Sequence, residues 1–149
     1  KTTLKQWHEI LGIILDGAFL CAQSALPHLR KSNQGRIINI GGMTAGSGAN
    51  HRVHVVTGKA GLEGLTKALA WDLAPDNILV NLIHPGMMDT HRDTASVPKK
   101  PKHHDIHKPL IERRGAPEEL AGMVAALCGP DGGFVTGQSI HVNGGAYLP

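Results

Sequence analysis

Three short apolar runs alternate along this chain with three longer segments of helical period, and this alternation limits its fold more than any other feature. The runs are "RIINI" at residues 36–40, "ILVNLIH" at residues 78–84 and "SIHVN" at residues 139–143. Each contains β-branched residues and is bounded by Gly or Pro, which is typical of strands covered on both faces. We therefore expect three buried parallel strands.

The segments that precede these strands carry apolar residues three and four positions apart, as one face of a helix requires. They predict helices over residues 3–31, 53–73 and 116–129, with Pro27 kinking or ending the first. Helices alternating with parallel strands give a Rossmann-like doubly wound α/β sheet, joined by right-handed crossovers. In such sheets ligands bind beyond the carboxyl ends of the strands.

Composition narrows the class of protein. The chain has 149 residues, of which 41% are apolar and 18% charged, as in one globular domain. Its apolar runs look too interrupted to cross a bilayer, and its first residues carry no signal or transit pattern, so we expect a cytoplasmic protein without a membrane span. Cys21 and Cys128 are expected to be buried free thiols. A net charge of +3 and 3% aromatic residues do not favour nucleic-acid binding.

Four blocks in a fixed order carry a resemblance to a known family. They are "GRIINIGG", "GKAGLEGLTKALAWDLA", "ILVNLIHPGMMDT" and "VTGQSIHVNGGAY", which resemble the C-terminal portion of a short-chain dehydrogenase/reductase. The resemblance covers nearly all of residues 1–149 apart from the His-rich loop. It implies one C-terminal Rossmann portion, an oxidoreductase acting with NAD or NADP on a small alcohol or carbonyl compound, and a homo-oligomer formed through the long helices.

The glycine-rich phosphate turn that opens this family's fold is not found in the sequence. The resemblance therefore implies that the N-terminal nucleotide-binding half is absent from these residues and that only the nicotinamide half of the cofactor site is present. The residues that match cofactor contacts of the family are Lys59, Ile40, Gly41, Pro85, Gly86, Met88 and Thr90.

The family's catalytic residues are a Tyr that exchanges a proton, a Lys one helical turn later, a Ser and an Asn. Lys59 stands at the lysine position, whereas Val55, Gly42 and Ile14 stand at the positions of Tyr, Ser and Asn. The four-residue spacing would place phenol and ammonium on one helical face, where the cation lowers the pKa of the phenol. The frame of the site is present, but three of its polar side chains are replaced.

Two alternatives follow for the chemistry. His54 could replace the missing acid, although it lies five residues before Lys59 and so points about 140° away on the helix. Thr44 and Ser47 could replace the missing hydroxyl, or could only stabilise a turn. The chain is then either a divergent oxidoreductase or a catalytically silent structural or regulatory subunit.

The His-rich segment raises the question of a metal. His103, His104 and His107 have a spacing compatible with a metal site, but several lysines surround them. We expect no metal here, and a substrate lid at this place in the chain.

Overall fold

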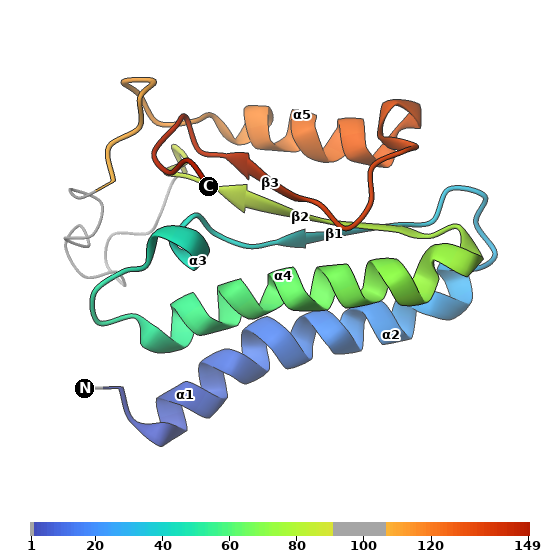
Figure 1. Ribbon diagram of the computed structural model, residues 1–149, viewed down its shortest axis with the longest axis horizontal. Coiled ribbons are helices and arrows are strands. Elements are labelled where there is room, and N and C mark those ends of the chain that lie inside the picture. The colour runs from blue at the N-terminus through green and yellow to red at the C-terminus, as the bar shows by residue number, and fades with distance from the viewer. Residues whose placement is uncertain (1, 91–106) are drawn as a thin grey trace.

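The computed structural model describes residues 2–90 and 107–149. Its helices are α1 (Leu4–Leu11), α2 (Gly17–Leu29), α3 (Thr44–Ser47), α4 (Val53–Leu73) and α5 (Pro117–Cys128), and its strands are β1 (Arg36–Ile40), β2 (Leu79–Pro85) and β3 (Ser139–Val142). Figure 1 shows three layers, with α1, α2 and α4 on one side of the sheet and α5 on the other. The predicted Rossmann-like α/β fold with three parallel strands is confirmed.

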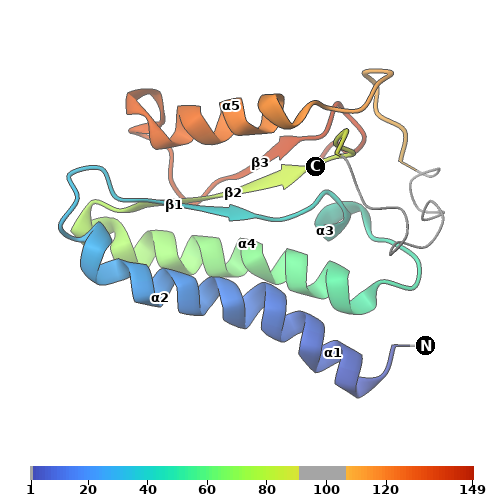
Figure 2. The same cartoon turned by 180° about the vertical axis from the view of Figure 1, so that it is seen from behind.

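The sheet brings three loops to one edge. Its order is β1-β2-β3 with all strands parallel, Ile37 opposite Val80 and Ile83 opposite Ile140. The carboxyl ends of the strands, the short helix α3 and the beginning of α4 lie at the same end of the molecule in both views (Figures 1 and 2). This is the edge at which ligands are expected.

The first helical segment is one long rod with an irregular centre. Thr3 and Gln6 form a reciprocal capping box at its start, with the Gln6 amide 3.2 Å from the Thr3 hydroxyl. A π-helical turn, Gly12–Asp16, joins α1 to α2, and Pro27 lies inside the last turns of α2. The predicted extent of this helix is confirmed, but its periodicity gave no sign of the π-helical turn.

The core lies between α2, α4 and the sheet. Its central cluster consists of Ala22, Leu69, Ala70, Leu73, Ile78 and Val80. Each large aliphatic side chain buried in this way stabilises the fold by about 1.5–3 kcal/mol. A buried hydrogen bond of 2.9 Å, from the Asn39 amide to the Thr66 hydroxyl, links β1 to α4 without leaving either polar group unpaired.

Two predictions about burial are wrong. β1 is not covered on both faces: only Asn39 is buried in it, and the side chain of Ile40 is 43% exposed. The reason is that α5 packs against β2 and β3 and not against β1, which is an edge strand of the sheet. Cys21 and Cys128 are free, as expected, but both are exposed because they lie on the outer sides of α2 and α5.

One argument behind the membrane expectation, that the apolar runs are too interrupted to span a bilayer, needs correction. The helix Leu4–Leu29 is 26 residues long, and an 18-residue stretch within it has a mean hydropathy of 1.6, enough by length and composition to cross a bilayer. Only 6% of that stretch is buried. Core helices of soluble proteins and signal sequences meet the same criterion. The helix therefore assigns no membrane by itself, but it leaves a large apolar face exposed.

Candidate functional site

Lys59 joins α4 to the end of β1. Its Nζ donates a hydrogen bond of 2.8 Å to the carbonyl oxygen of Ile40, the last residue of the strand. Burial lowers the pKa of the half-buried Lys59 ammonium below its ordinary value. The group is a cation fixed at the carboxyl edge of the sheet, and among the described residues two of its three N–H bonds are left for a ligand.

The positions around Lys59 are apolar and closely packed. Ile14, which the sequence resemblance aligns with the family's Asn, packs against Gly58, where an added Cβ would lie 3.0 Å from the Ile14 Cδ1. Val55, which the resemblance aligns with the family's Tyr, is half-buried in the first turn of α4. None of these side chains can give a proton to a ligand at the Lys59 amine.

The glycine loop after β1 continues along β2. The Gly41 amide donates to the Ile83 carbonyl at 2.8 Å, and the Met43 amide donates to the Pro85 carbonyl at 3.3 Å. Gly42, which the sequence resemblance aligns with the family's Ser, has open space around the point where a Cβ would stand, because no described atom lies within 4 Å. The backbone is therefore held in place, while room remains above Gly42.

His84, near the end of β2, is an additional polar group at this edge. Its side chain is fully buried and stacks on His141 of β3, with ring centroids 4.7 Å apart. Its Nδ1 lies 3.0 Å from the backbone of Gly42, and its Nε2 lies 3.2 Å from a carboxylate oxygen of Glu63 in α4. A buried imidazole thus connects the loop of the site to α4.

The Pro85-Gly86 turn brings β2 close to β3. A Cβ on Gly86 would lie 2.6 Å from the Asn143 Cα, and the Gly86 amide donates to the Val142 carbonyl at 2.9 Å. Met88 follows in an isolated bridge to Gly115, and Thr90 is exposed at the end of the described segment. Glycine at position 86 is needed because backbone atoms occupy the space of a side chain.

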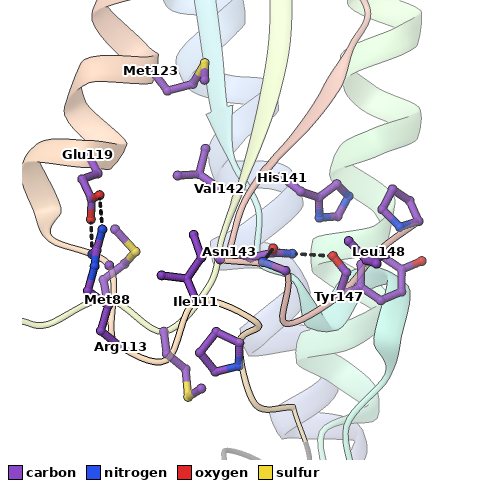
Figure 3. Close-up of a pocket in the computed structure, with 16 residues that line it drawn as sticks. Met88, Ile111, Arg113, Glu119, Met123, His141, Val142, Asn143, Tyr147 and Leu148 are labelled. Carbon is purple, nitrogen blue, oxygen red and sulfur yellow. Dashed lines mark hydrogen bonds and ion pairs between the residues drawn. The ribbon is translucent and has the colours of Figure 1, made fainter.

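A cavity of 390 Å³ lies beside this turn, between the end of β3, α5 and the residues before α5. Figure 3 shows Met88, Ile111 and Val142 around it, with the Arg113–Glu119 ion pair on the α5 side. The two terminal nitrogens of Arg113 each lie 2.7 Å from an oxygen of the Glu119 carboxylate. This ion pair, together with the hydrogen bond that the Ala116 amide donates to Glu119, lowers the pKa of Glu119 to about 2. The wall of the cavity is apolar with one charged pair, which suits a small partly apolar ligand.

The structure separates the other candidates. His54 lies on α4 with its Nδ1 buried and no hydrogen-bond partner among the described residues. The Ser47 hydroxyl donates to the Met43 and Gly48 carbonyls at 3.3 Å, which is a turn-stabilising role. Most of the His-rich segment lies outside the described residues, and within residues 2–90 and 107–149 no group of three metal-binding side chains occurs.

Comparison with known proteins places this arrangement in a family. The family model described as enoyl-(acyl carrier protein) reductase matches residues 1–147. The chain belongs to the short-chain dehydrogenase/reductase family. It is 40% identical over 147 residues to the 3-oxoacyl-(acyl-carrier-protein) reductase of Aquifex aeolicus, an alignment of 99% of this chain and 59% of that protein. It is 39% identical over 149 residues to the acetoacetyl-CoA reductase of Rhizobium meliloti, covering 99% of this chain and 61% of the relative.

Solved structures of family members superpose on the chain. Acetoin dehydrogenase from Salmonella typhimurium is 34% identical with a TM-score of 0.82, over 100% of this chain and 59% of that one. A blue fluorescent protein from a metagenomic library, in complex with NADPH, is 32% identical with a TM-score of 0.85, over 99% of this chain and 59% of its own. The chain thus spans about three fifths of the length of these short-chain dehydrogenase/reductases.

Sequence reasoning missed the His84–Glu63 pair and the cavity. A signal for the first was present, because an ionisable residue in an apolar strand must find a polar partner, and Glu63 lies one turn after Lys59 on the same helix. The cavity had no such signal, since its walls come from segments far apart in the sequence.

Proposed function

We propose that this chain forms the nicotinamide and substrate side of an NAD(P)-dependent oxidoreductase that acts on a small alcohol or carbonyl compound. The observation that carries this proposal is the Lys59 amine fixed on the Ile40 carbonyl, at the sheet edge where ligands of this fold bind. The relatives described above support a carbonyl as the reacting group, because they are two 3-ketoacyl-type reductases and an acetoin dehydrogenase.

The donors present at Lys59 fit a nicotinamide ribose. One N–H of the ammonium is used by the Ile40 carbonyl, and the two that remain suit a pair of neighbouring ribose hydroxyls. Ile40, Gly41, Pro85 and Gly86 would line the nicotinamide side with backbone, and Met88 and Thr90 follow Gly86 along the chain. The adenosine half would need residues beyond these, so we propose a half-site in which the choice between NAD and NADP is not made by this chain.

When bound, NAD(P)H supplies a hydride to the carbonyl carbon, and the carbonyl oxygen must then receive one proton to give the alcohol. Val55 cannot supply that proton. Lys59 can orient a water molecule that donates it, and its lowered pKa makes the ammonium a better acid than an ordinary lysine. His54 is the other candidate, with a buried ring nitrogen that has no partner among the described residues. Without a positioned phenol, we expect slow turnover, lower by about 10²–10⁴.

The 390 Å³ cavity is our candidate for the substrate side. Its methionines Met87, Met88 and Met123 are flexible apolar side chains that can adapt to an unbranched chain next to the reacting carbonyl. The cavity lies next to Gly86, so the reactive end of a ligand there would face the proposed nicotinamide position.

We also propose a homo-oligomer through the long helices. α1, the π-helical turn, α2 and α4 expose large apolar side chains, namely Leu4, Ile13, Phe19, Leu20, Val53 and Trp71. Trp71 is 84% exposed, and contiguous apolar surfaces of this kind mark protein or membrane contacts. A cytoplasmic location stays a prediction from the sequence.

The second candidate function is a catalytically silent subunit, favoured by the apolar residues at three catalytic positions. Two measurements separate the two functions. The first titrates the chain with NADH and with NADPH and follows cofactor fluorescence to detect binding. The second adds a panel of ketones and acyl thioesters and follows oxidation of the cofactor. Binding with oxidation of the cofactor supports the oxidoreductase. Binding without oxidation supports the silent subunit, and absence of binding to both cofactors contradicts the half-site.

A further inference from the structure

His84 is a fully buried titratable side chain for which the mechanism above has no use. It lies in β2 beneath the glycine loop, and its ring is so close to that loop that a Cβ on Gly41 would be 2.5 Å from Nδ1. The imidazole also stacks on His141, with an angle of 18° between the ring planes. Any movement of this ring would therefore disturb the loop.

The hydrogen bonds around Gly42 assign the tautomer of His84. Nδ1 lies 3.0 Å from both the amide nitrogen and the carbonyl oxygen of Gly42. The carbonyl already accepts the Ala45 amide at 2.9 Å, whereas the Gly42 amide has no other acceptor among the described residues. Nδ1 is therefore the acceptor, and the proton of the neutral ring lies on Nε2.

Nε2 faces Glu63 of α4. The Glu63 carboxylate oxygen is 3.2 Å away, within ion-pair distance, although the direction of approach is not that of an aligned hydrogen bond. The Glu63 side chain is about one-third exposed and free to rotate, whereas the His84 ring is fully buried, so a small rotation of the carboxylate aligns the bond. Glu63 is thus the acceptor that keeps the proton on Nε2.

Glu63 and Lys59 lie four residues apart on α4 and so share one face of the helix. Lys59 contacts the loop directly at the Ile40 carbonyl, and Glu63 reaches it at Gly42 through His84. The helix thus holds the three-residue stretch from Ile40 to Gly42 at both of its ends. That stretch carries the open position where the family has its serine.

We propose that Glu63 and His84 are positioning residues that fix the backbone of Gly41 and Gly42 at the nicotinamide side of the site. Their effect on cofactor binding rests on the proposed function, whereas their effect on the loop does not. Neither side chain is proposed to touch the cofactor or to move a proton in the reaction.

The tautomer can be measured on the unmodified chain by long-range ¹H–¹⁵N correlation of the imidazole ring, together with hydrogen exchange of the Gly42 amide. We expect the Nε2–H form of His84 and a protected Gly42 amide. A proton on Nδ1, or free exchange at Gly42, would overturn the proposal. Because this measurement needs no variant and no cofactor, it holds even if a substitution prevents folding.

Substitution of Glu63 tests the role of the carboxylate. Glu63→Ala should accelerate exchange at Gly42 about fivefold, the equivalent of ~1 kcal/mol for one hydrogen bond, and should weaken NADH binding by a similar factor. Glu63→Gln should restore both, because its side-chain oxygen still accepts from Nε2–H, and Asp72→Ala on the exposed side of the same helix should change neither.

The outcomes distinguish the two proposals. Unchanged exchange at Gly42 in Glu63→Ala would overturn the positioning role. If exchange at Gly42 is accelerated in Glu63→Ala but the unmodified chain binds no NADH, the positioning role is supported and the proposed function is contradicted.

Discussion

The Lys59 Nζ lies 2.8 Å from the Ile40 carbonyl oxygen, so the second turn of α4 is tied to the last residue of β1. This contact explains how a helical lysine reaches the carboxyl edge of the sheet. It also explains its lowered pKa, because the amine is half-buried between helix and strand. Lys59 is therefore the residue from which most of the predictions follow.

Removal of the Lys59 amine should weaken NADH binding. Lys59→Ala deletes the donors proposed for the ribose, and a charge-assisted hydrogen bond is worth about 1.5–3 kcal/mol, or roughly 10- to 150-fold in Kd. Fluorescence titration measures the change. Lys67→Ala, an exposed lysine two turns later, is the matched control, and equal losses in both variants would disprove the role of Lys59.

NADH binding should also depend on pH. The pKa of Lys59 is lowered, so its ammonium loses the proton at a lower pH than an ordinary lysine. Affinity should therefore fall as the pH rises through that lowered pKa, and the fall should be missing in Lys59→Arg, whose guanidinium stays charged. The same pH profile in both proteins would contradict the prediction.

Introducing a Ser at position 42 and a Tyr at position 55 should raise turnover. Gly42 has free space for a side chain and does not have a positive φ, so Gly42→Ser fits without strain. Combined with Val55→Tyr, it should raise the rate of ketone reduction by about 10²–10⁴. The control is Val55→Phe with Gly42→Ser, which lacks only the phenolic hydroxyl, and a similar gain in that control would exclude proton transfer as the cause.

The turn at Gly86 should not tolerate a side chain. A Cβ there would lie 2.6 Å from the Asn143 Cα, so Gly86→Ala must separate β2 from β3 at a cost of about 1–3 kcal/mol or more. In α5, Gly122 has open space, and Gly122→Ala should stabilise the fold by about 0.4–1 kcal/mol. Urea unfolding compares the two variants, and a neutral Gly86→Ala would show that the strands can move apart freely.

His141 should make folding sensitive to acid. Its pKa is lowered, first by burial and second by His84, while Glu63 acts in the opposite direction. A lowered pKa means that the folded state disfavours the protonated ring, so stability is complete above the ordinary value of 6.5 and falls as the pH drops below it. His141→Gln should reduce the loss between about pH 7.5 and about pH 5. His28→Gln, an exposed residue of α2, should leave it unchanged, and urea unfolding at the two pH values decides.

The order of helices and strands could be predicted from the sequence because periodicity reports burial along one element. The predicted second helix, residues 53–73, has the bounds of α4, and the strand "RIINI" is β1. Periodicity does not report which elements are neighbours. The sequence therefore predicted wrongly that β1 is covered on both faces and that the Cys128 thiol is buried.

The candidate site could be predicted only in part. Lys59, Gly41 and Gly86 follow from the resemblance, and each lies at the carboxyl edge of the sheet, although their roles stay predictions. His84 and Glu63 are 21 residues apart in the sequence and meet only because β2 packs beside α4. Such a pairing depends on register and packing, which one sequence does not specify.

The most direct test of the half-site is saturation-transfer NMR of NADH with this 149-residue chain. The predicted result is strong saturation transfer to the protons of the nicotinamide and its ribose and weak transfer to the adenine protons. The transfer to the nicotinamide side should be lost in Lys59→Ala. Stronger transfer to adenine than to nicotinamide, or a pattern unchanged in Lys59→Ala, would contradict the account.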